Sequence, residues 1–143
     1  MRIPIAEDLR AIERLLAESG LPTDDLVAQD LSLFRIEGSS DNPDAVGGLE
    51  KFGNSALIRS IATAPSMRGQ GVARKLVGEL EKLSAKEGIE NLYLLTESAE
   101  RYFESKGYST LERSNVPQSI RESRQFSSLC PDSATVMHKR VGV

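Results

Sequence analysis

The sequence predicts an α/β fold built on a mixed, mostly antiparallel sheet, and three observations lead to that class. Two apolar runs, SALIRSIAT (55–63) and NLYLLT (91–96), have the composition of buried central strands. An amphipathic segment over 71–87 lies between them and predicts a helical crossover. A Gly53-Asn54 pair precedes the first run, which is the signal of a tight hairpin to an earlier strand. A crossover joins parallel strands and a hairpin joins antiparallel ones, so the sheet should be mixed.

The N-terminal half predicts a helix and two strands. We expect a helix over 7–19, because Leu9, Ile12, Leu15 and Leu16 share one face and Gly20 follows. The remaining segments predicted here are a short edge strand at 2–5, a helical turn at 24–29, a strand at 31–37, a polar loop at 38–44 and a strand at 45–52.

The C-terminal half alternates helices and strands. The helix over 71–87 should bury a stripe of apolar residues and end at Gly88: Val72, Leu76, Leu80 and Leu83. A second helix is expected over 99–106, with Ser98 as its N-cap and Gly107 as its stop. The last predicted segments are a strand at 108–111, a polar loop at 113–131 with a helical turn at 117–122, and a closing strand at 134–141.

Length and composition predict one soluble domain over residues 1–143. The net charge of -3 argues against nucleic acid as the main partner. With Cys130 as the only cysteine, neither an intrachain disulfide nor a multi-thiolate metal site can form, and we expect no metal. The start MRIPIAEDLR lacks the apolar run of a signal peptide, and no stretch is long and apolar enough to span a membrane. We therefore predict a cytoplasmic protein with no membrane partner.

A glycine-rich turn joins the strand at 55–63 to the helix at 71–87: Arg68-Gly69-Gln70-Gly71-Val72-Ala73. The first N–H groups of a helix have no partner within it and the helix dipole is positive there, so this turn can hold an anion. The string GxxxxGK of a nucleotide P-loop is absent, and Arg74 occupies the last glycine position of a dinucleotide fingerprint. Two interpretations are left, a plain tight turn and a coenzyme A pyrophosphate site.

With these residues the sequence resembles the GNAT superfamily of N-acetyltransferases. That family carries Arg or Gln, two residues, Gly, one residue and then Gly or Ala at a strand–helix junction, which residues 68–73 match. Pro65 just before the turn, and the run Tyr102-Phe103-Glu104-Ser105-Lys106-Gly107-Tyr108, are similar to the family as well. The resemblance covers residues 55–141 well and the N-terminal part loosely.

The resemblance implies acetyl-CoA as co-substrate, with the thioester lying where the parallel strands 55–63 and 91–96 splay apart. Backbone groups near residues 61–63 would bind the pantetheine arm, and residues 68–74 the pyrophosphate. The cofactor-binding residues expected on this basis are Ile61, Ala62, Thr63, Arg68, Gly69, Gln70, Gly71, Val72, Ala73, Arg74, Thr96 and Phe103.

The catalytic groups depart from the family pattern. Many relatives carry a carboxylate on the strand before the turn, where this chain has Arg59 and Ser60. A hairpin at 53–54 would place Glu50 diagonal to Arg59, so Glu50 is expected either to form a structural ion pair or to accept the proton of the amine. The tyrosine that many relatives use as general acid is Phe103 here. Its neighbour Tyr102 is the candidate catalytic residue here, but it points about 100° away along a helix, so a solvent-fed route, Tyr93 or Tyr108 stays open as the proton donor.

The segment from Asn115 to Lys139 looks like the arsenic-resistance-associated branch of the family. The residues that match its pattern are Arg113, Val116, Pro117, Ile120, Ser123, Phe126, Leu129, Cys130, Pro131, Ser133, Ala134 and Met137. This resemblance implies a small amine, such as an amino acid that bears an arsenical or oxyanion group. Guanidinium groups bind such anions bidentately, so we list four arginines as candidate substrate-binding residues: Arg59, Arg113, Arg121 and Arg124. We expect Cys130 to be a packed apolar residue and His138 to be structural or exposed.

The function predicted from the sequence is therefore acetyl transfer from acetyl-CoA to a small-molecule amine. Two alternatives remain, a non-catalytic acyl-CoA-binding or regulatory module and a peptide or protein N-acetyltransferase. Relatives are often dimers, so a homodimer is also expected.

Overall fold

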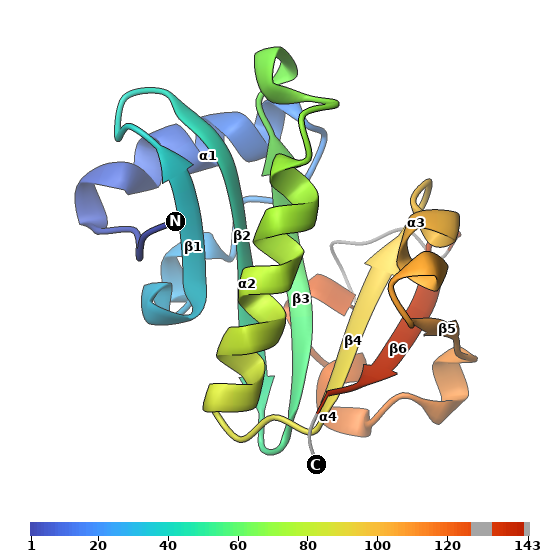
Figure 1. The fold of residues 1–143 in the computed structure, drawn as a ribbon. Coiled ribbons are helices and arrows are strands. Elements are labelled where there is room, and N and C mark those ends of the chain that lie inside the picture. Colours follow the sequence, from blue (N-terminus) through green and yellow to red (C-terminus); the bar gives the residue numbers. More distant parts are fainter. Residues whose placement is uncertain (127–132, 142–143) are drawn as a thin grey trace.

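The computed structural model describes residues 1–126 and 133–141, and within them one mixed six-stranded sheet forms the centre of the molecule (Figure 1). The strand order is β1-β2-β3-β4-β6-β5. The strands are β1 (Phe34–Gly38), β2 (Pro43–Phe52), β3 (Ser55–Thr63), β4 (Asn91–Thr96), β5 (Ser109–Thr110) and β6 (Thr135–Arg140). Only the β3–β4 pair is parallel, so the predicted mixed, mostly antiparallel sheet is confirmed.

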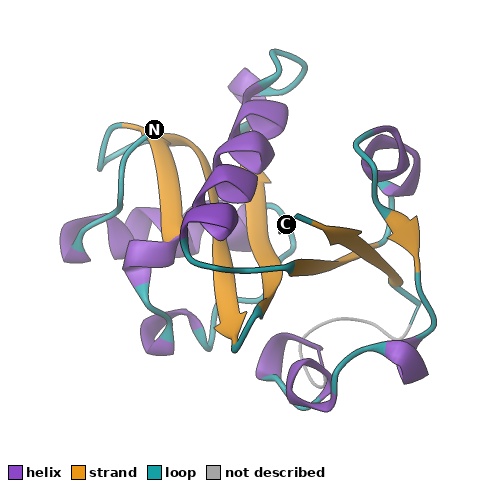
Figure 2. Cartoon of the chain, turned by 60° about the horizontal axis from the view of Figure 1, so that its bottom comes forward, coloured by secondary structure: helices purple, strands orange, loops and turns teal. Residues whose placement is uncertain are grey.

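The two central strands separate soon after they pair. Residues 55–57 of β3 lie beside 91–93 of β4, and the pairing stops there. Beyond that point the carboxyl ends diverge, so that β1–β3 and β4–β6 form two halves of the sheet (Figures 1 and 2). The expected splay at the central parallel strands is therefore present.

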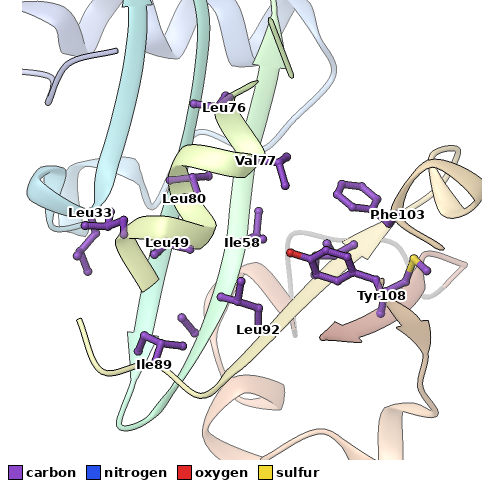
Figure 3. Close-up of a cluster of buried hydrophobic side chains, with 14 of the residues drawn as sticks. Leu33, Leu49, Ile58, Leu76, Val77, Leu80, Ile89, Leu92, Phe103 and Tyr108 are labelled. Atoms are coloured by element: carbon purple, nitrogen blue, oxygen red, sulfur yellow. The ribbon is translucent and has the colours of Figure 1, made fainter. Parts of the chain in front are cut away.

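Two longer helices cover opposite faces of the first half. Helix α1 (Leu9–Glu18) packs with Phe34, Ile36 and Val46 in one apolar cluster. Helix α2 (Val72–Lys86) packs on the other face, where its leucines contact Leu49 and Ile58 (Figure 3). Full burial of each such side chain stabilises the fold by roughly 1.5–3 kcal/mol. No helix in the described part of the chain is both long and apolar enough to cross a lipid bilayer.

Short elements complete the second half. The helices here are α3 (Glu100–Ser105) and α4 (Gln118–Arg121), with the single-turn 3₁₀ helix η5 (Arg113–Asn115) before α4. The other 3₁₀ turns lie in the N-terminal half of the chain: η1 (Ala6–Asp8), η2 (Leu26–Ala28), η3 (Leu31–Leu33) and η4 (Pro65–Met67). A third apolar cluster joins α4 to this half of the sheet through Ile120, Tyr93 and Val136. The polar segment after β5 therefore packs on the sheet through buried apolar side chains.

Several predicted boundaries were wrong by a few residues. The strand expected at 31–37 opens with the 3₁₀ turn η3, in which Asp30 accepts hydrogen bonds from the N–H and hydroxyl of Ser32. The edge strand expected at 2–5 shrinks to one bridge between Arg2 and Ile36. Helix α3 starts at Glu100, and the side chain that accepts a backbone N–H before it is Thr96, not the expected Ser98. Thr96 Oγ1 lies 2.9 Å from the Ala99 nitrogen.

Candidate active site between the diverging strands

A pocket of about 590 Å³ opens where β3 and β4 diverge, and we call it the central pocket. Both halves of the sheet, helices α2 and α3 and the turn after α1 contribute to its walls. Its lining includes Leu57, Arg59, Ser60, Ile61, Ala73, Val77, Leu95, Thr96, Tyr102, Phe103, Gln125, Ala134 and residues 19–22. Val77 of α2 and Phe103 of α3 face each other across it (Figure 3).

The glycine turn at the start of α2 presents free backbone donors. Gly69 and Gly71 have φ values of 79° and 77°, in the left-handed region that favours glycine, and no atom lies within 4 Å of where either Cβ would stand. The first hydrogen bond of the helix runs from the Lys75 N–H to the Gly71 carbonyl. The N–H groups from Gly69 to Arg74 make no hydrogen bond of good geometry with the residues that the structure describes.

These features fit a pyrophosphate. Open space beside two glycines lets an anion approach the backbone, and the dipole of a 15-residue helix adds positive potential. Arg68 and Arg74 are exposed and can bring mobile positive charge to the same place. The side chain of Gln70 is already engaged, because its amide donates to the Ser66 carbonyl. Val72 and Ala73 form the first turn of α2, and Ala73 also lines the central pocket.

Strand β3 carries an irregularity beside the central pocket. Arg59 pairs with Gly48 and Ala62 with Val46, so two residues of β3, Ser60 and Ile61, face a single residue of β2. Ser60 takes a φ of 59°, a strained value for a residue with a side chain. Such bulges re-aim the backbone at functional sites.

The three residues expected to bind the pantetheine arm, Ile61, Ala62 and Thr63, follow directly after the bulge. Ala62 and Thr63 pair with β2 on one side. On the other side β4 has already diverged, so beyond residue 57 the edge of β3 that faces β4 pairs with no strand of the described part of the chain.

Arg59 lies at the centre of a buried charged cluster, which we call the Arg59 cluster: Asp25, Glu50 and Arg59. The guanidinium binds Asp25 bidentately at 2.6 and 2.7 Å and donates to Glu50 Oε1 at 2.9 Å. Its Nε lies 3.2 Å from the Ser60 hydroxyl, so the cluster also holds the bulge. The Arg59 side chain has no exposed surface, and the side chains of Asp25 and Glu50 are 8% and 21% exposed.

The electrostatics of the cluster follow from these contacts. The hydrogen bond from Arg59 lowers the pKa of Asp25 below its usual value, although burial alone would raise it. Burial would lower the pKa of Arg59, but the two carboxylates outweigh that effect and raise it. Asp25 and Arg59 therefore stay charged at neutral pH, and two carboxylates beside one guanidinium give the cluster a formal charge of one negative.

The predicted ion pair between Glu50 and Arg59 is confirmed, and so is the hairpin register that placed them together. The expectation that Arg59 binds substrate meets a geometric obstacle. Four of its five N–H groups are used by Asp25, Glu50 and Ser60, which leaves one Nη2 hydrogen for any other acceptor. Asp25 was missed from the sequence because it lies 34 residues away in a turn with no local signal.

The two aromatic residues of α3 differ in their surroundings. Phe103 is buried and packs edge-on against Tyr108, with ring centroids 5.4 Å apart. Tyr102 lines the central pocket, and its hydroxyl is buried without a hydrogen-bond partner of good geometry among the described residues. Burial raises the pKa of Tyr102, while the nearby charge of Arg74 opposes the shift. A neutral hydroxyl without a protein acceptor is thus available to a bound molecule.

The other three arginines expected to bind substrate are engaged elsewhere or exposed. Arg113 donates to the Ala134 carbonyl at 3.0 Å and stacks over the Phe126 ring. Arg124 forms an ion pair with Asp24, and Arg121 is exposed on α4. None of the three lines the central pocket as the structure describes it.

Two further residues were singled out from the sequence. His138 is half-buried in β6, where its Nε2 lies 2.8 Å from Asn91 Oδ1, and burial lowers its pKa. That agrees with the structural role expected of it. Cys130 lies outside the described residues, as do Leu129 and Pro131 of the proposed branch pattern.

Comparisons with known proteins agree with this architecture. Residues 35–110, just over half of the chain, match the family model "Acetyltransferase (GNAT) domain". An uncharacterized N-acetyltransferase of Chlorobaculum tepidum is 34% identical over 65 residues, which is 46% of this chain and 41% of that protein.

Solved structures share the fold at low sequence identity. N-acetylglutamate synthase of Neisseria gonorrhoeae, complexed with coenzyme A and N-acetyl-glutamate, has a TM-score of 0.82 at 19% identity over 98% of this chain and 34% of that one. Rv2747 of Mycobacterium tuberculosis, in complex with CoA and NLQ, has a TM-score of 0.81 at 20% identity over 97% of each chain. The ribosomal-protein-S18-alanine N-acetyltransferase of Escherichia coli has a TM-score of 0.75 at 18% identity over 99% of this chain and 93% of that one.

The splayed sheet, the glycine turn and the family match define a GNAT acetyltransferase domain. The chain belongs to this family. It spans well under half the length of the Chlorobaculum relative and about a third of the synthase.

Proposed function

We propose that this chain is an acetyl-CoA-dependent N-acetyltransferase that acts on the amine of a small molecule. One observation carries the proposal: a run of free backbone N–H groups at the start of α2 opens beside a pocket between diverging parallel strands. Acetyl-CoA supplies an activated thioester, and its phosphates and its extended pantetheine arm match these two features.

Each expected cofactor residue has a role in this proposal. The N–H groups of residues 69–74 bind the pyrophosphate, with Arg68 and Arg74 as neighbouring cations. The open edge of β3 at residues 61–63 binds the amide groups of the pantetheine arm, as a strand binds its neighbour. Thr96 and Phe103 border the acetyl end of the central pocket, where Phe103 helps to exclude water.

The chemical groups are assigned from their surroundings. Glu50 is the candidate acceptor for the proton of the amine, directly or through water, because it is partly exposed and held by Arg59. Tyr102 is the candidate donor to the leaving sulfur, because burial keeps its hydroxyl protonated and the described residues supply no acceptor for it. Alignment of the two reactants in the pocket would supply much of the rate enhancement.

A small acceptor is supported by what surrounds the pocket. Its lining includes residues 19–22, which follow α1, together with Gln125 and Ala134. These segments would narrow a groove for an extended peptide. The arsenic-resistance branch, the homodimer and the cytoplasmic location stay predictions.

The test is release of free thiol from acetyl-CoA with three panels of acceptors: small amines, amino acids and short peptides. The proposal predicts turnover with a small amine and at least tenfold lower kcat/KM for every peptide. Binding of acetyl-CoA without turnover in any panel would instead establish a non-catalytic acyl-CoA-binding module. Preference for a peptide would assign a protein or peptide acetyltransferase.

A further inference from the structure

We infer that the acceptor is a cationic amine with no carboxylate near its amino group, selected by the negative charge of the Arg59 cluster. The inference rests on the proposed function and names the substrate class of that site. It reverses the expectation of an acceptor that bears an oxyanion group, which the resemblance to the arsenic-resistance-associated branch implied.

The Arg59 cluster has an excess of negative charge. Arg59 lines the central pocket, but two carboxylates neutralise and exceed its charge at 2.6–2.9 Å. The side chains are largely removed from water, so their net charge is screened less than a surface charge would be. Asp25 and Glu50 do not themselves line the described pocket; they contact Arg59, which does, and in our proposal a substrate there meets the net negative potential of the three groups.

The rest of the described pocket lining adds a negative charge and no further cation. Apart from Arg59, the charged residue that lines the described pocket is Glu97, which adds a further negative charge at the exposed mouth. Arg124 is already paired with Asp24, and Arg113 is tied to the Ala134 carbonyl. Residues 127–132, SSLCPD, lie outside the described structure, and their sequence contains no lysine, arginine or histidine.

A negative charge beside the pocket affects carboxylate and ammonium groups of an acceptor in opposite ways. A carboxylate beside the reacting amine would lose its water and gain no cationic partner on this side of the pocket, which is costly. An ammonium group would instead be attracted and concentrated there. Glu50 Oε2 forms no hydrogen bond with the described residues, so the cluster keeps an acceptor for an N–H donor.

The acceptor class proposed for this chain differs from what a structure with the same fold contains. N-acetylglutamate synthase shares the fold and was solved with N-acetyl-glutamate, which is an anion. At 19% identity the likeness carries the architecture, and the charges beside the pocket are this chain's own.

The experiment compares matched pairs that differ only in the carboxylate: tyramine with tyrosine, phenethylamine with phenylalanine, and cadaverine with lysine. Thiol release from acetyl-CoA gives kcat/KM for each. We expect the amine to exceed its amino acid at least tenfold in the pairs that are turned over, mainly through KM. Equal values, or a preference for the amino acids, would overturn the inference and leave the proposed function standing. No thiol release with any acceptor would overturn both.

A variant then tests the origin of the preference. Glu50→Gln removes the excess charge while keeping a side chain that can accept from Arg59, and the amine-to-acid ratio should fall at least fivefold. The ratio is measured on one preparation, so loss of folded protein or of chemical rate cancels. Glu79→Gln, on the outer face of α2 beside Lys82, is the matched control and should leave the ratio unchanged. An unchanged ratio in Glu50→Gln would overturn the assignment.

Ionic strength provides a measurement that needs no variant. If the preference is electrostatic, added salt should raise KM for the amines and change KM for the amino acids little or in the opposite direction. A preference that is identical at low and high salt would contradict selection by charge.

Discussion

The two sides of the central pocket are built from different parts of the chain. The cofactor side is made of backbone: N–H groups at the start of α2 and the open edge of β3. The acceptor side is made of charged side chains brought together over long distances in sequence, with Asp25 and Arg59 34 residues apart. A backbone site needs glycines at a few positions and tolerates change elsewhere, whereas a side-chain cluster changes its charge with each substitution. The first side carries the motif of the family, and in our proposal the second selects the acceptor.

A smaller contrast lies within the acceptor side. Asp25 pairs with the buried Arg59, while its neighbour Asp24 pairs with the exposed Arg124, 100 residues further along the chain. One short turn thus contacts β3 through a buried ion pair and the segment after α4 through an exposed one. The energies of buried and exposed pairs differ several-fold.

The largest effect is expected from breaking the cofactor side. Gly71→Glu forces a side chain into a left-handed conformation and places a carboxylate in the anion site. We expect acetyl-CoA affinity to fall more than about 100-fold, which is roughly 2.7 kcal/mol, in a calorimetric titration. Gly88→Glu is the matched control, because Gly88 has a φ of 76° and open space at the other end of the same helix. Equal losses in the two variants would contradict the pyrophosphate assignment.

Removing the cation of the acceptor side should damage stability. Arg59→Met leaves Asp25 and Glu50 without their shared partner, so we expect a loss of about 3–5 kcal/mol in the free energy of unfolding. Denaturant unfolding followed by circular dichroism measures it. A loss below about 1 kcal/mol would mean that the cluster is held together by something other than its charges.

Tyr102 tests the chemistry that joins the two sides. Tyr102→Phe keeps the ring that lines the pocket and removes the hydroxyl, so kcat should fall about 10²-fold while acetyl-CoA affinity stays unchanged. Adding Phe103→Tyr to the Tyr102→Phe variant is not expected to restore the rate, because the side chain at 103 packs against Tyr108. Steady-state rates of Tyr102→Phe equal to wild type would assign proton donation to solvent or another group.

The pH dependence of stability isolates Asp25. Its pKa is lowered in the folded state, chiefly by the hydrogen bond from Arg59, so it stabilises the fold above its ordinary value of 3.8. That contribution is lost as the pH falls through the lower folded-state pKa. The stability difference between wild type and Asp25→Asn should therefore be largest near neutral pH and shrink below about pH 4. Asp8, whose pKa is lowered by Arg2, is present in both proteins and cancels. A difference that stays constant with pH would contradict this account.

The smallest effect is expected at the exposed pair. Arg124→Ala should change the free energy of unfolding by less than about 1 kcal/mol, because the side chains of Arg124 and Asp24 are 58% and 54% exposed. The same denaturant measurement applies. A loss as large as that of Arg59→Met would remove the contrast between the two neighbouring pairs.

Local signals made much of the fold predictable. Strands β3 and β4 have the predicted bounds, and α2 begins one residue late and ends one residue early. Gly53-Asn54 predicted the register that pairs Glu50 with Leu57. Each of these features depends on residues close in sequence, such as apolar runs and turn glycines.

The unpredicted features depend on tertiary contacts. No glycine in β3 marks the strained bulge at Ser60, whose hydroxyl accepts a hydrogen bond from Arg59. The partners of Arg59 and Arg124 lie 34 and 100 residues away, so the four candidate arginines could not be sorted from the sequence. Six of the twelve cofactor residues were easier to propose because they are consecutive in one turn, 68–73.

The most direct test of the central claim is a calorimetric titration of the wild-type protein with acetyl-CoA, set beside NAD and ATP. Our account predicts saturable 1:1 binding of acetyl-CoA and at least 100-fold weaker binding of the two other pyrophosphate compounds, because the open edge of β3 adds contacts that only the pantetheine arm can make. No binding of acetyl-CoA, or equal binding of all three, would contradict a cofactor site shared between the turn and the diverging strands.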